Sequence, residues 1–182
     1  MIVPYPGLRP PSDKPIPKPK RIGVVLSVLN EHYQTTIHQG ICETAFQLGY
    51  EVFCIQGGVL NESLDLVRKN VIFDAVRLVR LDGLIVLTAA ITTSGERAMI
   101  RRLETLVQTL PAVSVGYPLG GLPAISIDNK HSFETILDHL LNAHGYRKIL
   151  YLGGPELHAD NQAREVVFCK TLEEAAAKYA SI

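Results

Sequence analysis

The sequence predicts an α/β fold: a doubly wound parallel sheet with helices on both faces. Short β-branched runs, such as RIGVVLS at 21–27 and LIVLT at 84–88, alternate with longer segments in which apolar residues recur at helical spacing. The 182 residues, 47% hydrophobic and 20% charged, suffice for one globular core but not for two large ones. Strands that alternate with helices form right-handed βαβ units and therefore a parallel sheet.

The first half of the chain contains a proline-rich start and then two strand–helix units. Residues 1–20 read MIVPYPGLRPPSDKPIPKPK, and proline at this density prevents both helix and central strand, which predicts a tether. We expect a strand at 21–27, a helix at 33–48 that ends at Gly49, a strand at 51–55, and a mostly helical segment at 61–79 with Asn61 as its N-cap.

The second half continues the alternation. We expect strands at 84–88 and 112–116, a helix at 93–110 stopped by Pro111, a short edge strand at 124–127, a helix at 132–143 ended by Gly145, a buried strand KILYL at 148–152, and a final helix at 160–179.

Charge and hydropathy exclude several classes of partner. Eighteen basic residues balance eighteen acidic ones, so the sequence shows no electrostatic surface for nucleic acid or for an anionic membrane. No apolar run approaches the ~20 residues of a membrane span, and the proline-rich start lacks the apolar core of a signal peptide. The three cysteines are widely spaced, as expected for small buried residues in a reducing compartment. A cytoplasmic location is the resulting expectation.

In an open α/β sheet, ligands bind beyond the carboxyl ends of the strands, where the winding reverses. The side chains expected there are polar or aromatic, and they suit a neutral, polyhydroxylated or heterocyclic ligand held by a few placed polar groups. Those that we select as candidate ligand-binding residues on this basis are Asn30, His32, Tyr33, Gln56, Tyr117 and Asp128.

Enzymatic motifs are missing from the sequence. It contains no GxGxxG after the first strand, no GxxxxGK[ST], no GxSxG and no HExxH, and its six histidines lack metal-ligand spacing. We therefore predict a protein that is not an enzyme, with no catalytic residues, no metal and no cofactor. A flavodoxin-like, nucleotide-dependent enzyme stays open as an alternative.

Several segments together resemble a known family. IGVVLSVLNEHYQ, LDGLIVL, LPAVSVG, PAISIDN and above all HLLNAHGYRKILYLGGPELHADNQAREVVF are similar to the ligand-binding domain of LacI/GalR-type regulators and periplasmic sugar-binding proteins, over about residues 21–168. A narrower resemblance, carried by Gly57-Gly58, Asn70 and Phe73-Asp74, is to the sensory version of this domain that is fused to histidine kinases or diguanylate cyclases.

The resemblance implies site residues. It places the loop 30–33 at the effector cleft, matches Asp128 to the aspartate of the family's DN pair, and matches Arg164 to an arginine that contacts the effector, with Phe168 as the aromatic that follows. Two positions depart from the pattern, because Val167 and Ser132 stand where glycine is common.

The resemblance also implies an organisation and a partner. Residues 1–20 form the tether, 21–160 the N-terminal lobe, and 161–182 a crossover helix or the start of the second lobe. The tether occupies the place of the helix-turn-helix of repressors, so no direct contact of this chain with nucleic acid is expected. A small-molecule effector, a homodimer and a fused or partner output domain are the expected partners.

Three functions follow from these observations. The first is a sugar- or nucleoside-sensing domain of a transcriptional regulator or signalling protein. The second is a dimerisation scaffold without a ligand. The third is the nucleotide-dependent enzyme named above.

Overall fold

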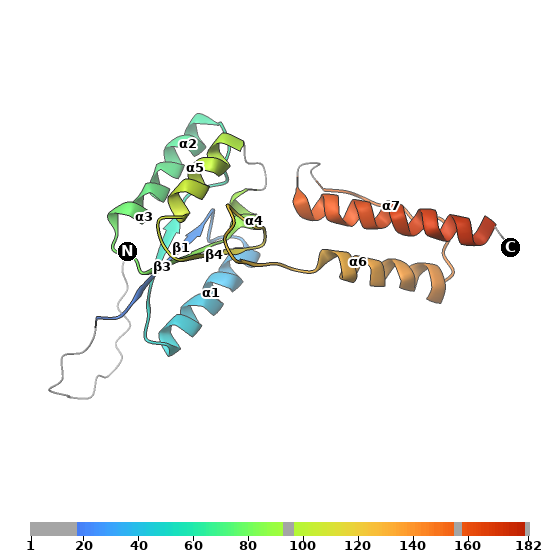
Figure 1. The fold of residues 1–182 in the computed structure, drawn as a ribbon, viewed down its shortest axis with the longest axis horizontal. Coiled ribbons are helices and arrows are strands. Elements are labelled where there is room, and N and C mark those ends of the chain that lie inside the picture. Colours follow the sequence, from blue (N-terminus) through green and yellow to red (C-terminus); the bar gives the residue numbers. More distant parts are fainter. Residues whose placement is uncertain (1–17, 93–96, 155–157, 181–182) are drawn as a thin grey trace.

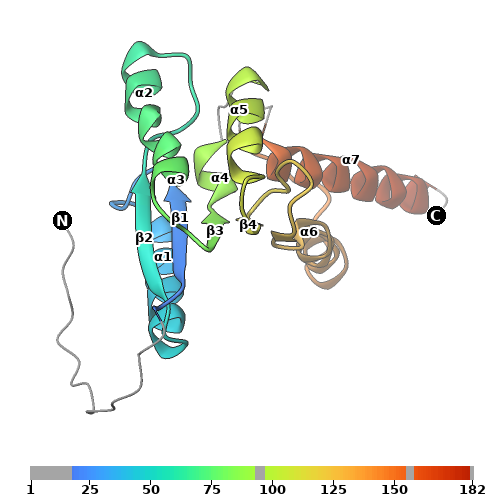
Figure 2. The same ribbon diagram turned by 60° about the vertical axis from the view of Figure 1, so that its left-hand side comes forward.

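The computed structural model describes residues 18–92, 97–154 and 158–180. Its centre is a five-stranded sheet with all neighbouring strands parallel, in the order β2-β1-β3-β4-β5. Figure 2 shows the first four of these strands side by side. The strands are β1 Arg21–Leu26, β2 Glu51–Gln56, β3 Gly83–Val86, β4 Ala112–Val115 and β5 Ala124–Ile125. The predicted doubly wound α/β fold is confirmed.

Helices lie on both faces of the sheet. The helix α1 covers one face, and α2, α3 and α5 lie on the opposite side (Figure 1). These helices and the short α4 are α1 His32–Gln47, α2 Leu64–Lys69, α3 Ala75–Leu78, α4 Thr88–Ile91 and α5 Arg97–Val107. The predicted helix at 93–110 thus corresponds to α5, and its first four residues lie outside the described part of the chain.

The helical segment after β2 is more broken than the sequence predicts. Between α2 and α3 the chain forms a 3₁₀ helix, η1 Asn70–Asp74. The N-cap is also different, because the Ser63 side chain accepts a hydrogen bond from the Leu66 N–H, whereas Asn61 accepts one from the Ser63 N–H. The prediction that Asn61 caps this helix was therefore wrong by two residues.

The core has two sides of unequal size. On the side of α2, α3 and α5, the buried Val25, Leu84 and Val86 pack with Phe73, Leu103 and their neighbours in a large cluster. On the side of α1, the buried cluster consists of Val24, Leu26 and Leu87. Alternate residues of β1 and β3 thus serve opposite faces, as expected for central strands of a parallel sheet.

A second unit follows β5. It contains the helices α6 Asn129–Asp138 and α7 Ala159–Ala180, which pack side by side, and the π-helical turn η2 His139–Ala143 at the end of α6. Figure 1 shows both helices beyond the edge of the sheet, with their N-terminal ends towards it.

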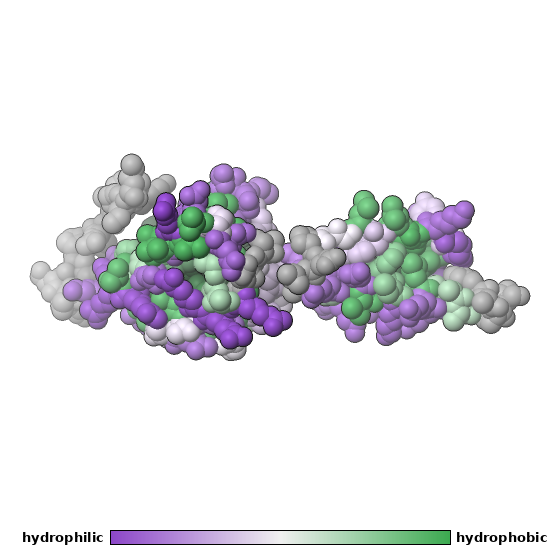
Figure 3. Space-filling view, turned by 90° about the horizontal axis from the view of Figure 1, so that it is seen from above, coloured by the Kyte–Doolittle hydropathy of each residue, from purple (hydrophilic) through white to green (hydrophobic). Residues whose placement is uncertain are grey.

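The predicted strand at 148–152 does not form, and this prediction was wrong. The residues run in irregular conformation between the two helices, and the side chains of Leu150 and Leu152 are 83% and 84% exposed. A strand needs a neighbouring strand for its backbone hydrogen bonds, and no such neighbour for this segment lies in the described ranges. Figure 3 shows apolar residues gathered on the surface of this unit.

Two further expectations concern cysteines and membranes. Cys54 and Cys169 are exposed and Cys42 is half-buried, so the expectation that all three are buried was wrong. Within the described ranges, no helix is both long and apolar enough to cross a bilayer.

Candidate functional site

The carboxyl ends of the five strands lie at one edge of the sheet, and this edge faces the N-terminal ends of α6 and α7 (Figure 1). The loop after β1 is fixed there by a buried amide. The Oε1 atom of Gln34, a residue that is 1% exposed, accepts hydrogen bonds from the Ser27 and Val28 N–H groups and from the Ser27 hydroxyl, at 3.0–3.1 Å. Its Nε2 donates to Glu31. These hydrogen bonds fix the loop from which the candidate residues Asn30, His32 and Tyr33 project.

The turn after β2 is held by the doubled glycine and by Asn70. An added Cβ on Gly57 would lie 2.3 Å from Cζ of Phe73, so only glycine fits there. The Gly58 N–H donates to Oδ1 of Asn70 at 2.7 Å, and Asn70 Nδ2 donates to the carbonyl of Val59. This arrangement gives a structural reason for the glycine pair and for the asparagine and phenylalanine that follow.

The turn after β4 is held by Thr88. Its hydroxyl accepts a hydrogen bond from the Tyr117 N–H at 2.9 Å and lies 2.8 Å from the carbonyl oxygens of Val115 and Tyr117, which share its single proton as acceptors. Thr88 is completely buried. Gly116 has a φ of +104°, which turns the chain so that Tyr117 follows directly after the strand.

Replacing Thr88 with valine is expected to lower the free energy of unfolding by about 1–3 kcal/mol, because the Tyr117 N–H loses its acceptor in a buried site. Urea denaturation measures the change. Thr88→Ser keeps the hydroxyl and should retain most of the stability. A larger loss in Thr88→Ser than in Thr88→Val would show that the methyl group, rather than the hydroxyl, holds the turn.

The ring of Tyr117 reaches the second unit. Its hydroxyl lies 2.6 Å from Nε2 and 2.8 Å from Nδ1 of His158, and it donates a longer bond of 3.4 Å to Asp160. The two rings also pack edge to face, with centroids 5.3 Å apart. Tyr117 belongs to the sheet lobe and Asp160 to the first turn of α7. Tyr117 therefore joins the carboxyl edge of the sheet to the start of α7.

A chain of polar contacts continues within the second unit. Asn129, the first residue of α6, donates through Nδ2 to Oδ1 of Asp160 at 2.7 Å. Its Oδ1 accepts from Nε and Nη2 of Arg164, at 3.1 and 2.7 Å. Asp128 instead caps α6, because its Oδ1 accepts the His131 N–H. Tyr117, His158, Asp160, Asn129 and Arg164 thus form one polar network that spans both units.

Burial, followed by the negative charge of Asp160, raises the pKa of Tyr117 to about 12. We expect the tyrosinate absorbance of the wild type minus that of Tyr117→Phe to titrate near pH 12 rather than near 10. Since the folded pKa is raised, the contribution of the neutral phenol to stability is complete below about pH 10 and is lost as the pH rises through 12. A difference curve centred at pH 10 would contradict first the burial of the Tyr117 phenol and then its contact with Asp160.

The sequence-predicted site residues divide into three groups. Tyr117 and Arg164 belong to the network, and Asp128 lies beside it as a helix cap. Asn30, His32 and Tyr33 lie exposed in the loop after β1 and the first turn of α1, and Gln56 is exposed at the end of β2. All four are at the carboxyl edge, and they lie outside the set of side chains that the network's hydrogen bonds join. His32 and Asp128 both follow carboxyl ends of strands, so both lie on the same side of the sheet.

Three network residues were not selected from the sequence: Asn129, His158 and Asp160. Asn129 stands next to the selected Asp128, and its role depends on the close approach of α6 and α7, which no local pattern indicates. Asp160 carries a sequence signal, because an acidic residue in the first turn of a long helix is favoured by the helix dipole. Within the described ranges, no group of three or more potential metal ligands occurs.

Comparison with family models matches residues 19–180 to the periplasmic binding proteins and sugar-binding domain of the LacI family. Comparison with curated protein sequences found no match.

Several solved structures have the same fold, and three of them are described below. A lac repressor dimer bound to operator and the anti-inducer ONPF has a TM-score of 0.68, 20% identity, and coverage of 87% of this chain and 52% of its own. The Cra transcriptional dual regulator from Pseudomonas putida, in complex with fructose 1-phosphate, has a TM-score of 0.61 and 20% identity, and the match covers 84% of this chain and 53% of its own. A periplasmic binding protein/LacI transcriptional regulator from Alkaliphilus metalliredigens, complexed with D-xylulofuranose, has a TM-score of 0.58 and 22% identity, and the match covers 87% of this chain and 53% of its own. The chain spans about half the length of these structures.

Proposed function

Because the chain belongs to the family of periplasmic binding proteins and LacI-type sugar-binding domains, we propose that it senses a small polyhydroxylated molecule for a regulatory or signalling protein, without transforming it. The observation that carries this proposal is the polar network from Tyr117 to Arg164, which lies between the carboxyl edge of the sheet and the start of α6 and α7. A ligand bound there contacts both units at once.

The chemistry of the network suits a neutral sugar. It offers a hydroxyl, an imidazole, an amide, one carboxylate and one guanidinium, which together donate to and accept from the hydroxyls of a sugar ring. The charges of Asp160 and Arg164 balance, so the site carries no excess of positive charge for a polyanion. The D-xylulofuranose complex of a neighbour with this fold agrees with this ligand class.

The sequence alone puts the boundary between the lobes at residue 160, but α6 and Tyr151 pack with α7 in the second unit. We propose that the chain supplies one lobe, residues 21–125, and the beginning of a second lobe from α6 onward, with the proline-rich residues 1–20 as a tether. The exposed Leu150 and Leu152 support an incomplete second lobe, because they lie where a core would form. A ligand stabilises the closed state of a two-lobed protein by its higher affinity for that state. Because this chain contains only the beginning of the second lobe, most of the free energy that a ligand gains on closure is lost.

Isothermal titration tests the proposal. We expect D-ribose, D-fructose, D-xylulose or adenosine to bind a form of the protein that contains both lobes, and to bind the 182-residue chain weakly or not at all. Tight one-to-one binding to the 182-residue chain would contradict the role of a second lobe. Absence of binding to the two-lobed form by every sugar and nucleoside tested would contradict sensing itself.

A dimerisation scaffold is the second candidate, and one surface favours it. Leu64 and Leu78 are 73% and 85% exposed, and Val71 and Ile72 between them are also exposed, so α2, η1 and α3 present apolar side chains to solvent. Sedimentation equilibrium of the wild type and of Leu78→Asp tests this surface. A wild type that stays monomeric at high concentration would contradict it.

The nucleotide-dependent enzyme gains no support from the glycines. A phosphate-binding loop needs free backbone N–H groups. Here the N–H of Gly57 donates to the carbonyl of Leu26, that of Gly58 to Asn70, and that of Gly154 to Asn161. These hydrogen bonds support our proposal of a binding protein rather than a nucleotide-dependent enzyme.

A further inference from the structure

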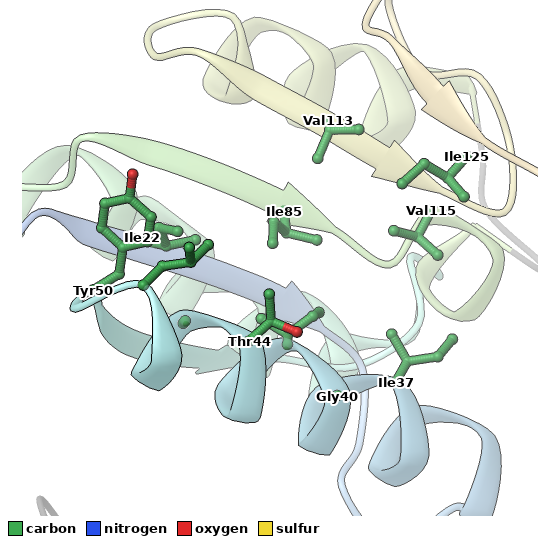
Figure 4. A pocket seen from close by; sticks show the side chains of 12 residues that line it. Ile22, Ile37, Gly40, Thr44, Tyr50, Ile85, Val113, Val115 and Ile125 are labelled. Atoms are coloured by element: carbon green, nitrogen blue, oxygen red, sulfur yellow. The ribbon is translucent and has the colours of Figure 1, made fainter.

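Two histidines meet at the C-terminal end of α6. Nε2 of His139 lies 2.9 Å from Nε2 of His144, and both side chains are exposed to solvent. Their rings meet edge to face, with centroids 4.6 Å apart and planes 87° apart. By contrast, the groove between α1 and the strands β3, β4 and β5 (Figure 4) is lined almost wholly by aliphatic side chains, without a histidine, a cysteine or a carboxylate. Ligands for a metal ion therefore lie at this turn and not in the groove.

The π-helical turn η2 brings the two histidines together. In an α-helix, residues five apart differ by about 140° around the axis, so their side chains diverge. In η2 the His144 N–H instead donates to the carbonyl of His139 at 3.2 Å, and this i→i+5 bond places the two residues one turn apart. A spacing of five is not a metal-ligand spacing on an α-helix, which is why the sequence alone did not indicate this pair.

The ring of His144 is also held from its other side. Gly145 has a φ of +69°, which turns the chain back on itself. The Tyr146 N–H donates to the carbonyl of Leu140 at 3.0 Å, and the Tyr146 ring stacks on His144, with centroids 5.4 Å apart and planes 11° apart. The imidazole of His144 is therefore oriented before any ligand arrives.

The contact between the two rings requires a proton or a cation between the nitrogens, because two facing lone pairs repel each other. At 2.9 Å, one ring donates an N–H and the other accepts it. We propose that His139 and His144 also bind a divalent transition-metal ion, which takes the position of this proton. The ring that donated the proton then carries it on Nδ1, so that each Nε2 offers its lone pair to the metal.

The distance between the nitrogens selects the kind of ion. Two nitrogens 2.9 Å apart, each about 2.0–2.1 Å from one ion, subtend an angle of about 90° at the ion. A tetrahedral ion would need nitrogens about 3.3 Å apart. Right angles between neighbouring ligands are typical of square-planar and tetragonal complexes, so the pair suits Ni(II) or Cu(II) better than Zn(II). Water completes the coordination.

This metal site is separate from the polar network. Asn129 begins α6 and His139 follows the last residue of this helix, so the two residues are about 15 Å apart along the helix axis. The proposal therefore goes beyond small-molecule sensing and does not depend on it. It departs from the expectation, drawn from the sequence, that the chain binds no metal.

Isothermal titration of the untagged 182-residue chain with nickel chloride tests the proposal. We expect one Ni(II) ion per chain, and an affinity at least about 100-fold lower in His139→Ala and in His144→Ala, because each variant loses the chelate. His131→Ala removes an exposed imidazole elsewhere on α6 and should bind Ni(II) as the wild type does. Excess Mg(II), which prefers oxygen ligands, should not compete.

A pair of potential ligands on α1 needs its own control, because Sγ of Cys42 lies 3.7 Å from Nε2 of His38. Cys42→Ser should keep the wild-type affinity for Ni(II). Full affinity in either His139→Ala or His144→Ala would overturn the proposal. So would an equal loss in His131→Ala or Cys42→Ser, or the absence of Ni(II) binding to the wild type. Circular dichroism confirms that each variant is folded.

Hydrogen exchange gives a second readout. A bound ion links the two ends of η2, so the turn cannot open before the ion leaves. At saturating Ni(II), the amides of residues 140–146 should exchange at least about tenfold more slowly than in the metal-free chain, and those of α1 should exchange at an unchanged rate. Unchanged exchange at residues 140–146, or equal protection of α1, would count against the site.

Discussion

Replacing Gly116 with alanine is expected to lower the free energy of unfolding by about 3–5 kcal/mol. Its φ of +104° disfavours any residue with a Cβ, and an added Cβ would lie 2.3 Å from the Cβ of Ala89 and 3.0 Å from the Ala89 backbone nitrogen. A backbone atom cannot move aside as a long side chain does, so conformational strain adds to overpacking. Urea denaturation with a linear extrapolation gives the difference directly.

Gly40 provides the matched control. It lies in the middle of α1, and an added Cβ there meets nothing within 4 Å. Gly40→Ala should therefore stabilise the protein by about 0.5–1 kcal/mol, because alanine has the higher helix propensity. If Gly116→Ala were as well tolerated as Gly40→Ala, the tight approach of the Tyr117 turn to α4 would be refuted.

Replacing Arg164 with alanine should weaken sugar binding by at least about 100-fold, which corresponds to the loss of one or two charge-assisted hydrogen bonds. In the structure, Asn129 holds the guanidinium through Nε and Nη2, so the side chain is oriented before a ligand arrives. Isothermal titration of the two-lobed form measures the affinity. This result presupposes the proposed function.

Two variants separate orientation from charge. Arg164→Lys keeps the charge, but an ammonium group cannot reproduce the pair of hydrogen bonds that Nε and Nη2 of Arg164 donate to Asn129. We therefore expect an intermediate affinity. Lys170→Ala, further along α7 and exposed, removes a charge of the same sign and should bind as the wild type does. If Lys170→Ala weakened binding as much as Arg164→Ala, a general electrostatic effect would replace the specific role of Arg164.

The strands of the sheet could be predicted well because each of them is visible as a local pattern in the sequence. Runs such as RIGVVLS and LIVLT are buried on both faces, and this burial is visible as continuous β-branched residues. KILYL at 148–152 has the same pattern but forms no strand, because the pattern reports the tendency to be buried and not the presence of a neighbour. The backbone of residues 148–152 would need a neighbouring strand from another part of the sequence to form a sheet.

The site was predictable only in part. Tyr117 follows a strand, and a parallel sheet places such residues at its carboxyl edge, so position alone identified it. Arg164 was identified from the family resemblance. Asn129, His158 and Asp160 meet through the packing of α6 against α7 and the approach of α7 to the sheet, and these tertiary contacts between segments up to 43 residues apart leave no local pattern.

The irregular segment between α6 and α7 has a consequence for biosynthesis. Its leucines point outward and its backbone lacks a strand on either side among the described residues, so it presents a template on which another chain pairs. Chaperone binding to nascent chains should therefore concentrate at Leu150 and Leu152, and overexpression of the isolated polypeptide should favour inclusion bodies.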